Sequence, residues 1–219
     1  MSSSRLNPEI NRRTFIASSA TFAIGYEGLM NSTSAMKPGG EAWPEYDQVI
    51  VVDFLASPGY FNYPLNPPLN NLMIANAIGS GITAVNLTVS GSNFTDTVQK
   101  IAGWMNRIER YPEAFTQVRT VDQLLATKRE RKLGIVFGFQ DTTPFEGRLE
   151  EIEIFLNLGV KVTQLTYNIR NLAGDGCLEP ANGGLTGYGH AIVERMNELG
   201  MIVDLSHCGQ RTTAQGISA

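Results

Sequence analysis

The sequence is poor in cysteine and histidine. Its 219 residues include only two cysteines, Cys177 and Cys208, and two histidines, His190 and His207. Two cysteines exclude a disulfide-rich scaffold and allow one bridge at most. Both follow a predicted strand, so they either pair with each other or remain as two small buried thiols.

The sequence also lacks long apolar runs and an excess of basic residues. No apolar stretch approaches the ~20 residues that a membrane-spanning helix needs. The 17 Lys and Arg residues against 21 Asp and Glu residues give a formal net charge of -4. Nucleic-acid-binding domains usually carry a basic face, so we expect no nucleic-acid partner and no transmembrane segment.

The first forty residues differ in character from the rest. They are polar and serine-rich, then carry Arg12 and Arg13, and then become apolar from Phe15 to Gly25. Paired arginines ahead of a short, weakly hydrophobic stretch are typical of a twin-arginine export signal. We therefore expect residues 1–40 to be a signal and linker, residues 41–219 to form the folded domain, and the mature protein to be periplasmic. The alternative is a polar tail with a chance pair of arginines.

From about residue 45 onward, apolar β-branched runs alternate with helical patterns. The runs predict buried strands over 48–54, 82–89, 133–139, 160–167 and 201–207. Apolar residues at helical spacing predict helices over 67–80, 95–111, 146–158 and 187–199. A further helix is expected to begin after Thr120, a good N-cap residue, and Gly159 and Gly200 are expected to end two of the helices.

Strands that alternate with helices predict a parallel α/β fold. No G-x-G-x-x-G motif follows the first strand, which removes the main support for a dinucleotide-binding sheet and favours a (β/α)8 TIM-type barrel. Such a barrel usually takes about 250 residues and eight βα units. The chain supplies about five units, so we expect a partial barrel from the N-terminal side of a longer sequence.

Functional side chains of such a barrel lie at the carboxyl ends of the strands. The polar residues that the predicted strands place there are Asp53, Gln140, Asp141, Tyr167, Asn168, Asp204 and His207. A histidine in this position is a candidate metal ligand or acid–base group. By contrast, His190 falls within a predicted helix and is expected at the surface.

Four short elements follow one another over residues 165–209. They are Thr166-Tyr167-Asn168, Gly184-Leu185-Thr186 followed by Gly189, Met196-Asn197-Glu198-Leu199-Gly200, and Asp204-Leu205-Ser206-His207. In this order they resemble the membrane dipeptidases, also called renal-type dipeptidases. A weaker resemblance, in layout rather than in letter, extends over residues 48–219.

The resemblance implies a (β/α)8 barrel that hydrolyses dipeptides with two zinc ions bridged by a carboxylate. On the matching positions, His207 is a zinc ligand. Tyr167 stands where the family has a substrate-contacting histidine, and Asn168 beside it is a second candidate for substrate binding.

The chain departs from the family at the remaining ligand positions. The first-strand His-x-Asp falls on Leu55 and Ser57, and the bridging glutamate falls on Gln140. Leucine cannot bind a metal, and a glutamine oxygen carries no charge. Gln140 therefore remains only a weak candidate ligand, together with the nearby carboxylates Asp53 and Asp141.

These observations predict a metallodipeptidase with a degenerate first metal site that holds at most one zinc ion tightly. A non-catalytic dipeptide-binding homologue is one alternative, and a hydrolase of another small amide is a second. The sequence identifies no catalytic acid or base, and it gives no indication of oligomeric state.

Overall fold

The structure is a computed structural model that describes residues 45–58 and 69–219. These residues belong to one compact unit, Pro44–Ala219. The predicted export signal lies outside the described residues. No helix in the described part of the chain is both long and apolar enough to cross a membrane.

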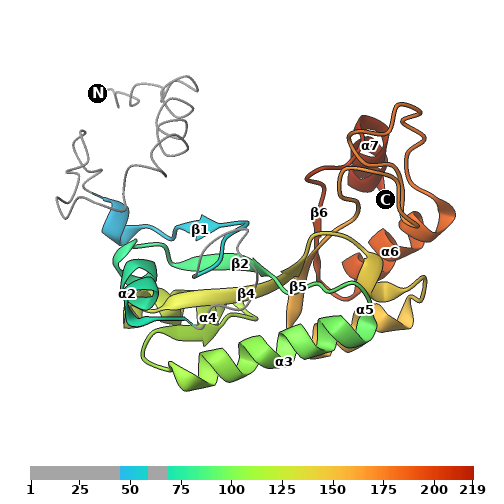
Figure 1. Ribbon diagram of the computed structural model, residues 1–219. Helices are drawn as coiled ribbons and strands as arrows, with labels where there is room; N and C mark the ends of the chain where they lie inside the picture. Colours follow the sequence, from blue (N-terminus) through green and yellow to red (C-terminus); the bar gives the residue numbers. More distant parts are fainter. Residues whose placement is uncertain (1–44, 59–68) are drawn as a thin grey trace, which may run out of the picture. The chain divides into compact units, whose positions relative to one another are not determined.

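A parallel sheet forms the centre of this unit (Figure 1). Its strands are β1 (Val52–Asp53), β2 (Ala84–Thr88), β4 (Leu133–Phe139), β5 (Val160–Gln164) and β6 (Ile202–Asp204), hydrogen-bonded in that order. All five predicted strands are therefore present, although four are shorter than expected. A sixth strand, β3 (Phe115–Gln117), was not predicted and pairs in parallel with β4.

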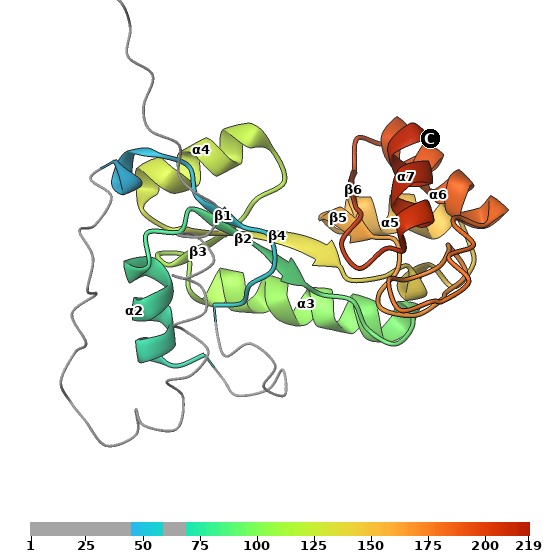
Figure 2. The ribbon, with the colours of Figure 1, turned by 90° about the horizontal axis from the view of Figure 1, so that it is seen from above.

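Helices connect the strands, as a βα-repeat requires. They are α2 (Asn71–Gly79), α3 (Phe94–Arg110), α4 (Val121–Glu130), α5 (Glu150–Asn157), α6 (Gly187–Glu198) and α7 (Gln210–Ser218), with short 3-10 helices η1 (Tyr46–Gln48) and η2 (Thr143–Phe145). Figure 2 shows the helices distributed along the sheet, with α3 and α4 beside the first strands and α5 to α7 beside β5 and β6. The partial (β/α)8 barrel expected from the sequence is thus present.

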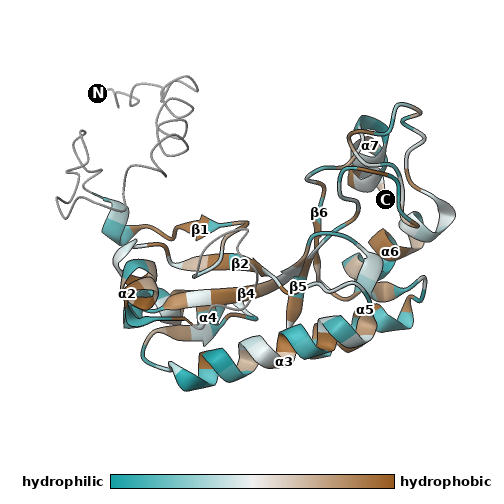
Figure 3. Ribbon diagram, viewed as in Figure 1, coloured by the Kyte–Doolittle hydropathy of each residue, from teal (hydrophilic) through white to brown (hydrophobic). Residues whose placement is uncertain are grey.

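The core lies between the sheet and its helices. Alternate residues of β4, Leu133, Ile135, Phe137 and Phe139, are buried in one hydrophobic cluster that also contains Ile101 and Trp104 of α3. Figure 3 shows the matching pattern, with hydrophobic strands and hydrophobic and hydrophilic residues interspersed along α3. Burial of each such large side chain contributes about 1.5–3 kcal/mol, so the two-sided burial of the strands drives the sheet to form.

Local signals set the helix ends. Thr120 and Gln123 form a complete capping box at the start of α4, as expected from the N-cap threonine. Gly159 and Gly200 follow α5 and α6 with φ of 101° and 65°, a left-handed conformation that glycine adopts without strain. However, α5 begins at Glu150 rather than at Glu146, because Glu146 and Gly147 both have positive φ.

The short strand β3 occupies the connection between α3 and α4. It is only three residues long and pairs with the first half of β4. Arg119, just after it, donates from Nη2 to the carbonyls of Leu156 (3.2 Å) and Asn157 (2.8 Å). The guanidinium therefore pairs the carbonyl of Asn157 at the C-terminal end of α5 and adds a second partner to that of Leu156, which also accepts from the N–H of Gly159 at 2.9 Å.

Candidate active site

The polar residues at the ends of β5 and β6 form one cluster. These two strands are paired neighbours, so the segments that leave their carboxyl ends emerge side by side. The rings of Tyr167 and His207 stack with centroids 4.3 Å apart and an interplanar angle of 22°. The Oδ1 atom of Asn168 lies 2.8 Å from Nδ1 of His207. The structure thus brings together the three residues predicted as metal ligand and substrate contacts.

A tight turn ends β6 three residues before His207. Oδ1 of Asp204 accepts hydrogen bonds from the backbone N–H of Ser206 (2.8 Å) and from its hydroxyl (2.6 Å). His207 itself has φ of 59°, a conformation that costs a non-glycine residue about 1–3 kcal/mol and often marks a functional site. The strand predicted over 201–207 therefore stops at Asp204, because this carboxylate turns the chain out of the sheet.

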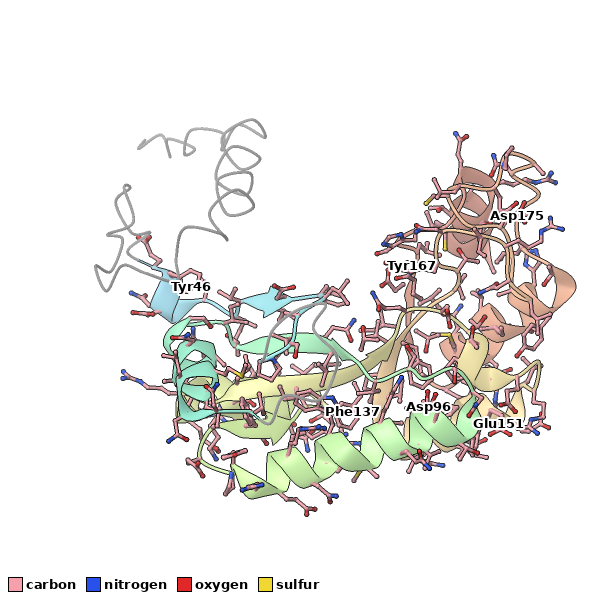
Figure 4. The ribbon with its side chains drawn as sticks, in the orientation of Figure 1. Tyr46, Asp96, Phe137, Glu151, Tyr167 and Asp175 are labelled. Carbon is pink, nitrogen blue, oxygen red and sulfur yellow. The ribbon has the colours of Figure 1, made fainter. Side chains whose placement is uncertain are left out.

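An ion pair between the exposed Arg170 and the buried Asp175 shapes the loop over residues 165–186. Asp175 has no solvent-exposed surface and accepts from Nε of Arg170 at 2.5 Å and from the N–H of Gly183. The Arg170 guanidinium and the Gly183 N–H lower the pKa of the Asp175 carboxyl below its usual range. Figure 4 shows Tyr167 and Asp175 on the same loop system above the strand ends, with Asp175 towards α7. Thr212 of α7 donates to the Asp175 carbonyl (2.8 Å), which ties the loop to that helix.

An antiparallel bridge joins this loop to the segment after β6. Gly176 pairs with Cys208, and the N–H of Cys177 donates to the carbonyl of His207 at 2.8 Å. This pairing makes Cys177 the cross-strand neighbour of His207, with its Sγ 3.6 Å from Oδ1 of Asn168. Both cysteines are free, Cys177 exposed and Cys208 buried against Thr166. Of the two alternatives left by the sequence, the structure therefore has unpaired thiols, only one of which is buried.

The candidate ligands on the first strands lie elsewhere. Asp53 is exposed, and its Oδ1 accepts from the N–H of Leu55 at 2.9 Å. Oδ1 of Asp141 likewise accepts from the N–H of Thr143 at 2.9 Å, and Gln140 is partly buried at the end of β4. These carboxylates act locally as turn and helix caps, which is a common use of aspartate.

The strand order separates these residues from His207. Three strands lie between β1 and β6 in the sheet. With neighbouring strands about 4.8 Å apart, the two strands are about 19 Å apart along the sheet. Across residues 45–58 and 69–219, no three His, Cys, Asp or Glu side chains gather where they could hold a metal ion. Asp53 and Asp141 therefore do not gather with His207 into such a group among these residues, and the roles of Asp53, Gln140 and Asp141 as ligands remain predictions.

Asn86 of β2 positions the segment after β1. The side-chain Nδ2 of Asn86 donates to the main-chain carbonyl of Phe54 at 2.9 Å, and the main-chain carbonyl of Asn86 accepts from the N–H of Ala56 at 3.2 Å. The side chain is buried beside Gly138, where a Cβ atom would lie 2.1 Å from Oδ1 of Asn86. Sequence reasoning missed this residue, although one amide within an otherwise apolar strand was the available signal.

A pocket of about 250 Å³ opens between α2 and the segment after β1. Ala56, Ser57 and Met73 are among the residues that line it, and His207, Tyr167 and Asn168 are not. The polar cluster at the ends of β5 and β6 and this pocket are therefore separate features.

The profile of one protein family, described as membrane dipeptidase (peptidase family M19), matches residues 72–219. This chain belongs to the membrane dipeptidase family. The match includes the loop with Tyr167 and Asn168 and the strand end with His207, which are the parts of the chain that form the polar cluster.

Several individual proteins are similar to this member of the membrane dipeptidase family. It is 27% identical over 131 residues to dipeptidase tcpJ of Claviceps purpurea, covering 59% of this chain and 31% of the relative. It is 30% identical over 118 residues to dipeptidase verJ of Clonostachys rogersoniana, covering 53% and 30%. A crystal structure of an amidohydrolase from Pseudomonas aeruginosa is 34% identical, with a TM-score of 0.70, and the match covers 79% of this chain and 50% of that one. The chain thus spans about a third of the length of the curated relatives and half of that of the solved structure.

Proposed function

We propose that this protein is a metal-dependent dipeptidase. The observation that carries the proposal is the cluster of His207, Asn168 and Tyr167 at the ends of two paired strands, within the segment that matches the family. A histidine whose second ring nitrogen is hydrogen-bonded is the usual form of a protein metal ligand. A dipeptide is the substrate class that the family description supports.

The donor atoms near the strand ends do not fit a two-zinc site. His207 offers one nitrogen, whereas Leu55 and Ser57 replace the first pair of ligands and Gln140 replaces the bridging carboxylate. Two dications held close together without a bridging anion would repel each other strongly in a partly desolvated site. We therefore propose that His207 contributes to the binding of at most one zinc ion. A bound zinc ion would supply an activated water at neutral pH.

Elemental analysis of the dialysed protein tests this proposal. We expect at most one tightly held zinc ion per chain and measurable hydrolysis of a panel of unmodified dipeptides. His207→Ala should abolish both. His190→Ala is the matched control, because His190 is exposed on α6 and its loss should leave both unchanged. Two tight zinc ions per chain would contradict the one-ion proposal, and equal activity in the two variants would contradict the role of His207.

A non-catalytic dipeptide-binding homologue is the second candidate. The observation in its favour is the apolar Leu55, which is 37% exposed, at a position where the family has a ligand. Calorimetric titration of the metal-free chain with a dipeptide distinguishes the two functions. Hydrolysis of the same dipeptide is then assayed over a range of added zinc concentrations. Binding to the metal-free chain with no hydrolysis at any of these concentrations would favour the binding homologue and overturn the dipeptidase proposal.

We also propose that Arg12 and Arg13 direct export to the periplasm. The supporting observation is the apolar stretch from Phe15 to Gly25 behind the arginine pair. Cells that produce the wild-type chain are fractionated beside cells that produce the variant with both arginines changed to lysine. The variant should remain in the cytoplasm, and equal periplasmic amounts of the two proteins would refute the proposal.

A further inference from the structure

The hydrogen bond between Asn168 and His207 determines which nitrogen of the imidazole carries the proton. An amide oxygen can only accept a hydrogen bond, and Oδ1 of Asn168 lies 2.8 Å from Nδ1 of His207. The proton of the neutral ring must therefore be on Nδ1, which leaves the lone pair on Nε2. Among the described residues, no other side chain is hydrogen-bonded to this ring.

A second donor supports the orientation of the amide. Sγ of Cys177 also lies within 3.6 Å of Oδ1 of Asn168. The thiol is a donor whichever tautomer His207 adopts, so it favours the orientation of the amide that presents Oδ1, rather than the NH₂ group, to both the thiol and Nδ1. The Asn168 backbone is held as well, because its carbonyl accepts from the N–H of Leu178 at 2.9 Å.

The plane of the imidazole is fixed by a different contact. Tyr167 stacks on the ring at a centroid distance of 4.3 Å, and Tyr167 precedes Asn168 in the chain. Two consecutive residues of the loop after β5, Tyr167 and Asn168, therefore set the ring plane and the tautomer of His207, which follows β6. Cross-strand pairing of Cys177 with His207 keeps the two segments in register.

We propose that Asn168 is a positioning residue that holds His207 in the Nδ1–H tautomer and presents Nε2 as its free donor atom. The proposal deepens the proposed function, which gives Nε2 a metal ion to bind. The tautomer can be measured with no metal present, so the two proposals fail separately.

Nitrogen NMR of the full chain tests the proposal directly. The chain is labelled with ¹⁵N-histidine and studied metal-free near pH 8, where histidine is ordinarily neutral. Only two histidines contribute signals, and His190→Ala assigns them. We expect His207 to show a protonated, pyrrole-type Nδ1 and an unprotonated, pyridine-type Nε2. A protonated Nε2 in the wild-type chain would overturn the proposal.

Three variants separate positioning from folding. Asn168→Leu should shift His207 towards the Nε2–H tautomer, whereas Asn168→Asp, which keeps an acceptor oxygen, should retain the wild-type pattern. Cys177→Ser is the matched control and should also retain it, because it leaves the Asn168 oxygen in place. Unchanged His190 signals in every variant show that α6 is folded. A wild-type tautomer in Asn168→Leu would overturn the proposal.

Zinc titration provides the second measurement. Loss of a residue that orients a ligating histidine typically weakens metal binding 10–100-fold, so Asn168→Leu should bind zinc about that much more weakly than Asn168→Asp does. A sulfur-to-metal charge-transfer band in the cobalt-substituted chain, lost in Cys177→Ser, would place the metal beside Nδ1 and refute the assignment. If the wild-type chain binds no zinc, the proposed function fails while the tautomer result stands.

Discussion

The contact between α6 and the site loop leads to a sharp stability prediction. An alanine Cβ at Gly189 would lie 1.9 Å from the carbonyl oxygen of Ala173, whereas real Cβ atoms essentially never approach closer than 3.0 Å. That oxygen also accepts from the N–H (2.9 Å) and the hydroxyl (3.2 Å) of Thr186, the N-cap of α6. Gly189→Ala must therefore push the helix off the loop and disturb its cap.

The expected loss is about 2–4 kcal/mol, because overpacking costs about 1–3 kcal/mol and a disturbed N-cap costs about 1 kcal/mol. Amide hydrogen exchange on the dilute full chain measures it. Exchange in α6 and in residues 165–186 should become about 30- to 700-fold faster in Gly189→Ala, at 1.4 kcal/mol for each factor of ten.

Gly187→Ala is the matched control in the same helix. Its added Cβ meets no atom within 4 Å, and alanine is the better helix former. Protection of α6 should therefore be unchanged or higher. Equal exchange rates in the two variants would refute the claim that close approach of the Ala173 carbonyl is what requires glycine at position 189.

Two further predictions concern other groups. Burial raises the pKa of Tyr188 to about 12, and its hydroxyl lies near the backbone of Gly147 without a well-formed hydrogen bond. Tyr188→Phe should leave the thermal midpoint unchanged or higher, and a fall of several degrees would show that the hydroxyl is bonded. The lowered pKa of Asp175 means that its ion pair stabilises the folded chain above the ordinary carboxyl pKa and is lost as pH falls through the lower, folded value. The stability difference between the wild type and Asp175→Asn should therefore be constant from pH 7 to 5 and narrow below pH 4, and a difference independent of pH would contradict this.

The sequence predicted the polar cluster because its members depend on local order along the chain. Tyr167, Asn168 and His207 each follow an apolar run, and parallel strands place their carboxyl ends at the same edge of the sheet. The structure adds that β5 and β6 are direct neighbours. Their metal-binding and substrate-binding roles remain predictions.

The parts that the sequence did not predict depend on how an irregular loop folds, on one contact distant in the chain and on one very short strand. The ion pair between the exposed Arg170 and the buried Asp175 depends on how the loop folds back to Gly183, and the role of Asn86 depends on its pairing with the segment after β1. The strand β3 has only three residues, too few for a hydrophobic period to appear. Asp53 and Asp141 remain predictions as ligands, because a strand-end carboxylate that caps a turn cannot be distinguished from a metal ligand by its position alone.

The two cysteines differ in exposure, and this difference gives the protein a single site for thiol labelling. Cys177 is the only exposed thiol, and Cys208 is buried, with a pKa that burial raises. A maleimide dye or a spin label should therefore react at one position without any change to the sequence. Because Cys177 pairs across from His207, such a label would sit beside the imidazole and report on whatever binds there. A thiol-reactive fragment library would likewise be directed to the candidate active site.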